Sequence, residues 1–125
     1  MKKFNFHLCF STLFCILVLL TLGCSNDEPK ISKGNFYYIQ YEATLAYGHR
    51  TTLHFIDEKN QPITIETGNT GGKFQRIIGP VDKNFVANIS SSYNRVGLYI
   101  YCSRNNEPFV QKAKGTSSVS YAIDY

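Results

Sequence analysis

Hydrophobic residues follow two different patterns along this chain, one continuous and one alternating. Residues 8–22 form an apolar run that Ser11, Thr12 and Thr21 interrupt. This run of about 15 residues is shorter than the roughly 20 that a transmembrane helix needs, but it fits the apolar part of a secretory signal. From residue 35 onward, apolar residues alternate with polar ones in short segments. The first pattern predicts a removable export signal, and the second predicts a β-domain.

The alternating segments predict β-strands because they are rich in Tyr, Phe, Ile, Val and Thr, which favour pleated, half-buried surfaces. Turn residues separate the segments, and the four prolines lie at segment ends or in the linker before the domain. Such spacing is typical of a sandwich. The expected strands cover residues 36–46, 51–57, 63–67, 74–78, 85–89, 96–103 and 117–125. We therefore expect a single all-β sandwich of about seven strands over residues 35–125.

Three connecting or terminal features refine this prediction. Residues 68–72 contain three glycines, so we expect the most flexible loop there. Asn105-Asn106 is a hairpin signal. A strand that reaches Tyr125 is usually tied into a sheet, so this residue is expected to be structural.

The apolar run ends at a cysteine in a characteristic setting. Leu20-Thr21-Leu22-Gly23-Cys24 resembles the lipobox of bacterial lipoproteins, although Thr21 departs from the usual aliphatic residue. The resemblance implies that residues 1–23 are a signal peptide. It also implies that Cys24 is lipidated, with palmitate among the attached acyl chains. Acyl chains contribute roughly 0.8 kcal/mol per buried methylene, so two or three of them hold a protein on a membrane. The alternative is an uncleaved N-terminal helix.

Residues 24–34 are polar and contain a proline and a glycine, which predicts a tether between the lipidated cysteine and the domain. Its first residues resemble the acidic export signal of surface-exposed lipoproteins of the Bacteroidetes; they are Ser25, Asn26, Asp27 and Glu28. The resemblance implies surface display, whereas a merely solvated spacer is compatible with a periplasmic position. The expected location is therefore the outer membrane of a cell envelope, on either side.

Charge and cysteine content exclude several classes of function. Loss of Lys2 and Lys3 with the signal lowers the formal net charge of +4 by two, and no basic cluster remains for nucleic acid. Cys9 and Cys15 also leave with the signal, so Cys102 is the only free thiol and no intramolecular disulfide is expected. Cys102 alternates with apolar neighbours, which predicts a buried thiol. No cysteine–histidine spacing matches a metal site, and no cofactor is expected.

Candidate catalytic residues are sparse. His49 and His54 are the only histidines after the signal, and neither has a second ligand or a catalytic partner at useful spacing. The serines of residues 90–92 lack the Gly-x-Ser-x-Gly setting of a hydrolase nucleophile. The sequence therefore predicts that the protein is not an enzyme.

Tyrosine is the residue type that most favours a binding role. All nine tyrosines follow the signal, and tyrosine combines a large apolar area with a polar tip. We predict an exposed face for an envelope protein or a glycan, formed by Tyr37, Tyr41, Tyr99 and Tyr101. The alternative is that these residues serve cross-strand pairing alone.

Several segments resemble known families. Residues 52–62 and 98–109 resemble a strand–turn–strand and a later turn in the soluble domain of the mycobacterial MmpS membrane proteins. Residues 78–85 and 120–125 look like a group of small Bacteroides lipoproteins. The resemblance implies an immunoglobulin-like or transthyretin-like sandwich. Members of the mycobacterial family are accessories to a lipid and siderophore exporter. They have a transmembrane helix where this chain is expected to carry a lipid anchor, and they have a cysteine pair that this chain lacks.

Together these features predict a membrane-anchored, non-enzymatic binding or accessory module of the cell envelope, with a transport-associated role implied by the resemblance. Recognition would use a sheet face or the loops at residues 68–72 and 90–94. The alternative function is a protease inhibitor or an immunity-type lipoprotein, which would present a rigid loop to its target.

Overall fold

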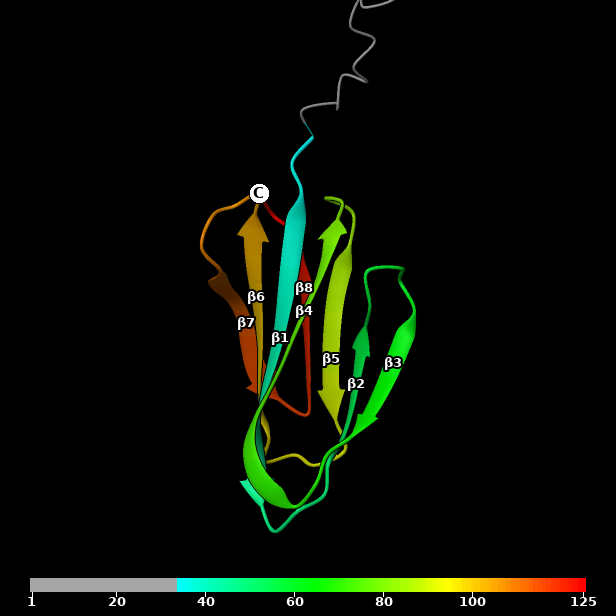
Figure 1. Ribbon diagram of the computed structural model, residues 1–125, viewed down its shortest axis with the longest axis vertical. Coiled ribbons are helices and arrows are strands. Elements are labelled where there is room, and N and C mark those ends of the chain that lie inside the picture. Colours follow the sequence, from blue (N-terminus) through cyan, green and yellow to red (C-terminus); the bar gives the residue numbers. More distant parts are fainter. Residues whose placement is uncertain (1–33) are drawn as a thin grey trace, which may run out of the picture. The chain divides into compact units, whose positions relative to one another are not determined.

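The computed structural model describes residues 34–125, which fold into eight β-strands (Figure 1). The strands are β1 (Tyr37–Tyr47), β2 (Thr52–Ile56), β3 (Pro62–Glu66), β4 (Thr70–Val81), β5 (Val86–Ser91), β6 (Gly97–Arg104), β7 (Val110–Thr116) and β8 (Ser118–Ala122). Within these residues no helix is long and apolar enough to cross a membrane. The predicted signal, Cys24 and the export signal at Ser25, Asn26, Asp27 and Glu28 lie outside the described residues.

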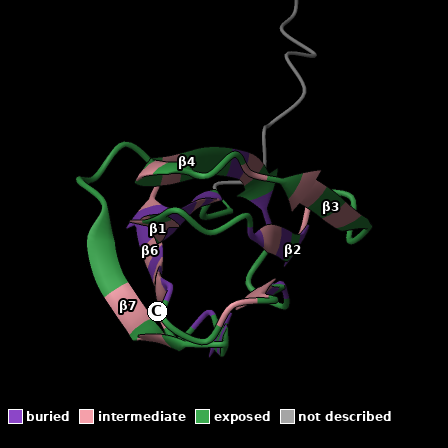
Figure 2. Cartoon of the chain, turned by 90° about the horizontal axis from the view of Figure 1, so that it is seen from below, coloured by how far each residue is buried: buried purple, intermediate pink, exposed green. Residues whose placement is uncertain are grey.

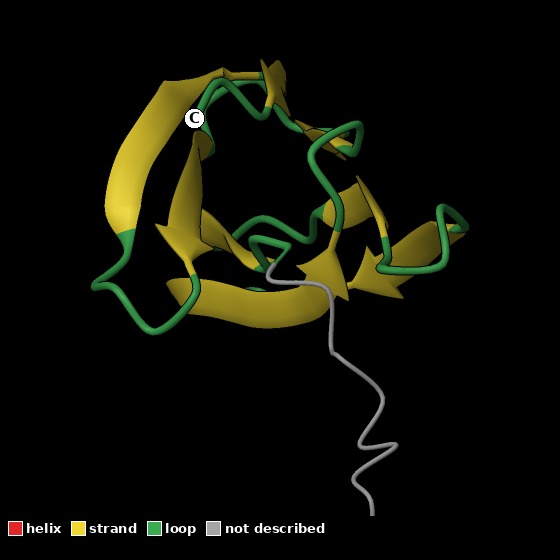
Figure 3. Cartoon of the chain, turned by 90° about the horizontal axis from the view of Figure 1, so that it is seen from above, coloured by secondary structure: helices red, strands yellow, loops and turns green. Residues whose placement is uncertain are grey.

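The strands form two four-stranded antiparallel sheets. Sheet A has the order β4-β1-β6-β7, and sheet B has the order β3-β2-β5-β8. The first strand therefore pairs with β4 and β6, whereas β2 lies in the opposite sheet. Viewed along the strand direction, the strands of both sheets surround a common centre (Figure 3). The predicted all-β sandwich is confirmed.

The core lies between the sheets because each strand turns alternate side chains inward. The register of β1 and β6 places Ile39 opposite Cys102 and Tyr41 opposite Ile100, and all four side chains are fully buried. Sheet B contributes Leu53, Phe55, Ala87, Ile89, Val119 and Tyr121 to the same core. Figure 2 shows this burial on the strands that line the interior. The predicted inward positions of β6 are confirmed, including the buried Cys102.

Strand β4 is longer than the sequence pattern predicted. Gly71 and Gly72, with φ of +71° and +104°, lie inside it rather than in a loop over residues 68–72. At the other end the strand continues through Gly79, which has a φ of +137°. A Cβ atom there would lie 2.7 Å from Cδ1 of Tyr38, so close approach of β1 and β4 requires glycine.

Strand β7 raises the number of strands to eight. Its sequence, Val-Gln-Lys-Ala-Lys-Gly-Thr, has no apolar alternation, and it forms an edge of sheet A. Lysines on an edge strand discourage pairing with other chains, so this composition fits its position. The turn before it contains Asn105 at a φ of +54°, which confirms the predicted hairpin.

Strand β8 ends at Ala122, before the end of the chain. Tyr125 nevertheless packs on the core, because its ring stacks on Tyr37 with 5.7 Å between ring centroids. Nζ of Lys112 lies 4.1 Å from the centroid of the same ring. The predicted structural role of Tyr125 is therefore confirmed by packing rather than by strand pairing.

Candidate functional site

The predicted tyrosine surface is split by the sandwich. Tyr37 and Tyr41 are 2% and 0% exposed and point into the core, whereas Tyr99 and Tyr101 are half-buried on the other face of sheet A. The four residues therefore form no common exposed face, and this prediction is wrong. Aromatic residues occupy both faces of β1, so alternation alone did not identify its inner side; the register with the inward Ile100 of β6 does.

A different set of residues forms the outer face of sheet A, which we call the tyrosine face. It consists of Tyr38 and Gln40 from β1, Ile77 from β4, Tyr99 and Tyr101 from β6, and Lys114 from β7. The register places Gln40 between Ile77 and Tyr101, and Lys114 beside Tyr99. The Tyr99 and Tyr101 rings lie 6.5 Å apart, and Ile77 is 50% exposed. The face therefore offers aromatic and apolar area beside polar groups.

An ion pair between β1 and β4 lies at the edge of this face, beside Tyr99. Glu42 projects outward from β1 opposite Gln75 and Tyr99, yet the residue is only 8% exposed. Its Oε1 lies 3.1 Å from Nζ of Lys73 in the neighbouring strand β4. Because the carboxylate is covered and paired, the charges that this face presents to solvent are those of lysines.

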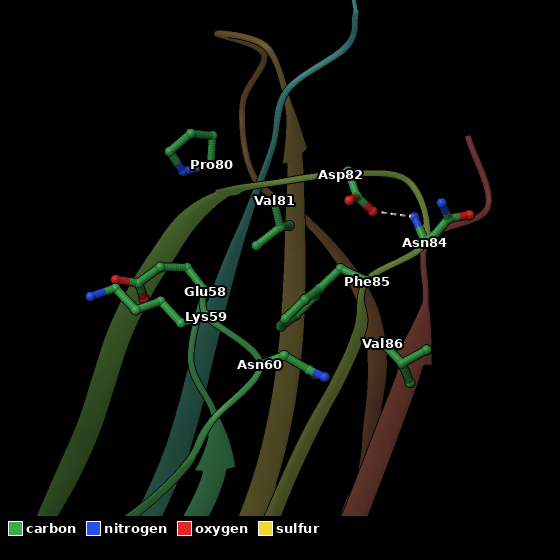
Figure 4. A pocket seen from close by; sticks show the side chains of 9 residues that line it. All are labelled: Glu58, Lys59, Asn60, Pro80, Val81, Asp82, Asn84, Phe85 and Val86. Atoms are coloured by element: carbon green, nitrogen blue, oxygen red, sulfur yellow. Dashed lines mark hydrogen bonds between the residues drawn. The ribbon is translucent and has the colours of Figure 1, made fainter.

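The second candidate is an open cleft of about 680 Å³ at one end of the sandwich (Figure 4). The β2–β3 turn lines it with Glu58, Lys59 and Asn60. The end of β4, the β4–β5 turn and the start of β5 line it with Pro80, Val81, Asp82, Asn84, Phe85 and Val86. Its volume lies within the range of roughly 300–1,000 Å³ common for small-molecule sites.

The cleft exists because β2 and β5 separate. Their pairing ends at Phe55 and Ile89, before the β2–β3 hairpin reaches its turn. The hydroxyl of Tyr41, which reaches across from sheet A, donates a hydrogen bond of 2.8 Å to the carbonyl of Ile56. Burial raises the pKa of Tyr41, and hydrogen bonds with the backbone of Asn88 and Ile56 offset part of that rise. The buried Tyr41 side chain thus provides hydrogen-bond partners for backbone groups of Ile56 and Asn88, at the point where β2 and β5 are no longer paired.

Local hydrogen bonds hold both turns of the cleft. Oδ1 of Asp57 accepts from the backbone N–H groups of Lys59 and Gln61 at 3.0 and 2.8 Å. Oδ1 of Asp82 accepts from the N–H of Asn84 at 2.7 Å (Figure 4). Such side-chain caps fix turn geometry, so the lining residues are held in place without a bound molecule.

The other polar candidates lie apart from these two surfaces. His54 is exposed and bonds through Nδ1 to Oγ1 of Thr64 at 2.9 Å, while His49 stacks on Tyr93. Burial raises the pKa of the Cys102 thiol, which has no exposed area. Over residues 34–125 no group of three or more His, Cys, Asp or Glu side chains is arranged to hold a metal ion.

Comparison with known protein families, with curated proteins and with solved structures gives no match. The tyrosine face includes Tyr99 and Tyr101, which the sequence pattern selected, together with Tyr38, Gln40, Ile77 and Lys114, which it did not select. None of the cleft residues was selected as a site. Their common position depends on two turns that are distant in sequence, so the only local signal was their turn composition.

Proposed function

We propose that this protein is a lipid-anchored, non-enzymatic binding module of a bacterial cell envelope, and that its tyrosine face contacts an envelope protein. The observation that carries the binding role is the outer face of sheet A, where three half-buried tyrosines surround Gln40 beside the exposed Ile77. The anchor rests on the apolar run and on Cys24 after Gly23.

The chemistry of the tyrosine face favours a protein partner. Tyrosine supplies large contact area with few rotatable bonds and is enriched at the centre of interfaces. Gln40 provides an amide that both donates and accepts hydrogen bonds. Lys73, with a 59% exposed side chain, and Lys114 give the rim positive charge. A complementary partner surface would therefore place carboxylates around an apolar centre.

An accessory role follows from combining this face with the anchor. A lipid tether keeps the domain close to membrane proteins, so weak contacts operate at a high effective concentration. The resemblance of residues 52–62 and 98–109 to the soluble domain of mycobacterial transport accessories supports a membrane protein complex as the partner.

The anchor is tested by metabolic labelling of the full chain with an alkyne analogue of palmitate in the source organism. The wild type should incorporate label and fractionate with membranes, and Cys24→Ser should lose both properties. Cys15→Ser, inside the predicted signal, is the matched control and should behave like the wild type. Labelling that persists in Cys24→Ser would refute the anchor.

The face is tested by photo-crosslinking in the same cells, with benzoylphenylalanine at position 99 or 101 of the full chain. A single adduct, identified by mass spectrometry, should form at both positions. Position 47 is the control, because Tyr47 is 84% exposed and is not part of the tyrosine face. Binding of the purified partner should weaken at least tenfold in Tyr101→Ala and remain unchanged in Tyr47→Ala. Equal crosslinking at all three positions would contradict the proposal.

A further inference from the structure

The cleft between the β2–β3 and β4–β5 turns combines an apolar lining with polar side chains. Val81 and Phe85 are 7% and 9% exposed and form the buried part, while Val86 is 49% exposed. Figure 4 shows Glu58, Lys59 and Asn60 on one side and Val81, Asp82, Asn84 and Phe85 on the other. An apolar lining with a few placed polar groups is the usual composition of a small-molecule site.

Two amide side chains in the cleft are available to a ligand. Within residues 34–125, Asn60 and Asn84 hydrogen-bond only through their backbone N–H groups, to the carbonyl of Asp57 and to Oδ1 of Asp82. Each amide therefore retains two donors and one acceptor oxygen. The carboxylate of Asp82 uses Oδ1 for the turn and retains Oδ2 as an acceptor.

The charge of the lining limits the class of ligand. Glu58 and Asp82 carry two negative charges and Lys59 carries one positive charge, and none of the three takes part in an ion pair within the described domain. The cleft therefore carries one net negative charge, and Lys59 is the only basic side chain in its lining, too few to hold phosphate, sulfate or carboxylate. A single net charge spread over an open, solvated cleft is also a weak attraction for cations, because water and salt screen it.

We infer that this cleft binds a neutral saccharide of one or two rings. A sugar ring presents C–H groups on its faces, which pack on apolar side chains; here these are the exposed Val86 and the small part of Phe85 that borders the cleft. The edge of the ring carries neighbouring hydroxyls, and each hydroxyl can donate and accept a hydrogen bond. The side-chain amides of Asn60 and Asn84 can likewise donate through the NH2 group and accept through the oxygen. The site lies on two turns at one end of the sandwich, shares no residue with the tyrosine face, and does not depend on the proposed function.

The test is a titration followed by ¹H–¹⁵N NMR on residues 34–125, which contain the whole core described above. Maltose, cellobiose and N-acetylglucosamine are the neutral probes, and sulfate and a trilysine peptide are the charged ones. At least one neutral saccharide should shift the amide signals of residues 58–60 and 82–86 in a saturable manner. Saturable shifts there with only a charged probe, or with no probe up to tens of millimolar, would overturn the inference.

Two variants then test the assigned contacts. Asn60→Gly removes the amide while tolerating the φ of +60° at this position, and Asn84→Ala leaves the backbone hydrogen bond to Asp82 in place. Each should weaken saccharide binding by about three- to tenfold, the loss expected for one neutral hydrogen bond. Asn94→Ala, an exposed asparagine in the β5–β6 loop, is the control and should bind as the wild type. Unchanged affinity in both cleft variants would refute the site.

Discussion

Replacing Tyr41 with phenylalanine should destabilise the domain substantially although it removes one oxygen atom. The residue is fully buried, and its hydroxyl donates to the carbonyl of Ile56 at 2.8 Å. β2 and β5 are no longer paired beyond Phe55 and Ile89, and the β3 residue opposite Ile56 is Pro62, which has no N–H. No neighbouring strand therefore replaces this donor. The bond is partly buried, and leaving its backbone acceptor without a partner costs about 1–3 kcal/mol. For a domain of this size, about 2 kcal/mol corresponds to a Tm lower by roughly 10 °C.

Urea unfolding and calorimetry of Tyr41→Phe measure this loss directly. Tyr101→Phe is the matched control, because its ring lies on the half-buried tyrosine face and should lose less than about 0.5 kcal/mol. Amide exchange at Asn88 should also accelerate in Tyr41→Phe, since its backbone contacts the same hydroxyl. A loss in Tyr41→Phe no larger than that of the control would show that water or direct strand pairing replaces the hydroxyl, and would refute this account of the cleft.

Alkaline pH provides an independent measurement on the same group. Burial raises the pKa of Tyr41 in the folded state, whereas an unfolded tyrosine titrates near pH 10. The stability that depends on the neutral phenol is therefore complete below about pH 10 and is lost as the pH rises through the folded pKa. The loss is about 1.4 kcal/mol per pH unit for one group. Tyr41→Phe should show a correspondingly shallower decrease between about pH 10 and pH 11.

Three further substitutions test other parts of the structure by urea unfolding. Gly79→Ala should cost about 2 kcal/mol, because the residue has a φ of +137° and its new Cβ would lie 2.7 Å from Cδ1 of Tyr38; wild-type stability would refute the close approach. Lys73→Met should cost about 1 kcal/mol by leaving the covered Glu42 carboxylate unpaired, a value kept small because the lysine is 59% exposed; wild-type stability would refute a role of this pair. Tyr125→Ala should cost about 1–2 kcal/mol through lost stacking and cation–π contacts, and Tyr125→Phe should retain most of that stability.

The sequence predicted the fold class well because alternation is a local signal that sheet burial enforces. In β6 the pattern identifies Leu98, Ile100 and Cys102 as one face, and all three are buried. In β1 the same reasoning is ambiguous, because aromatic residues lie at consecutive positions. The odd-numbered and the even-numbered residues of this strand would each form an acceptable core face. The choice depends on which side of sheet A meets sheet B, and that is a property of long-range pairing.

The remaining differences also arise from interactions that are distant in sequence. Strand β7 has a polar composition with two lysines, so only its pairing with β6 identifies it as a strand. Gly71 and Gly72 favour a loop by composition, yet pairing with β1 extends β4 across them. The cleft was not predictable at all, since its lining joins two turns whose proximity depends on the separation of β2 and β5.

The misassigned tyrosine explains how that cleft can form without unpaired backbone groups. Two adjacent strands that separate inside a sheet expose donors and acceptors to the core, and this is costly unless another group bonds to them. Tyr41 comes from the opposite sheet, and its hydroxyl reaches Ile56 at the position where pairing ends. The β2–β3 turn can therefore diverge from β5 and leave room for Asn60 and Phe85 to line an open site. Tyr41 thus acts on the cleft from inside the core as a positioning residue, whereas Tyr38, Tyr99 and Tyr101 lie on the outer face of sheet A.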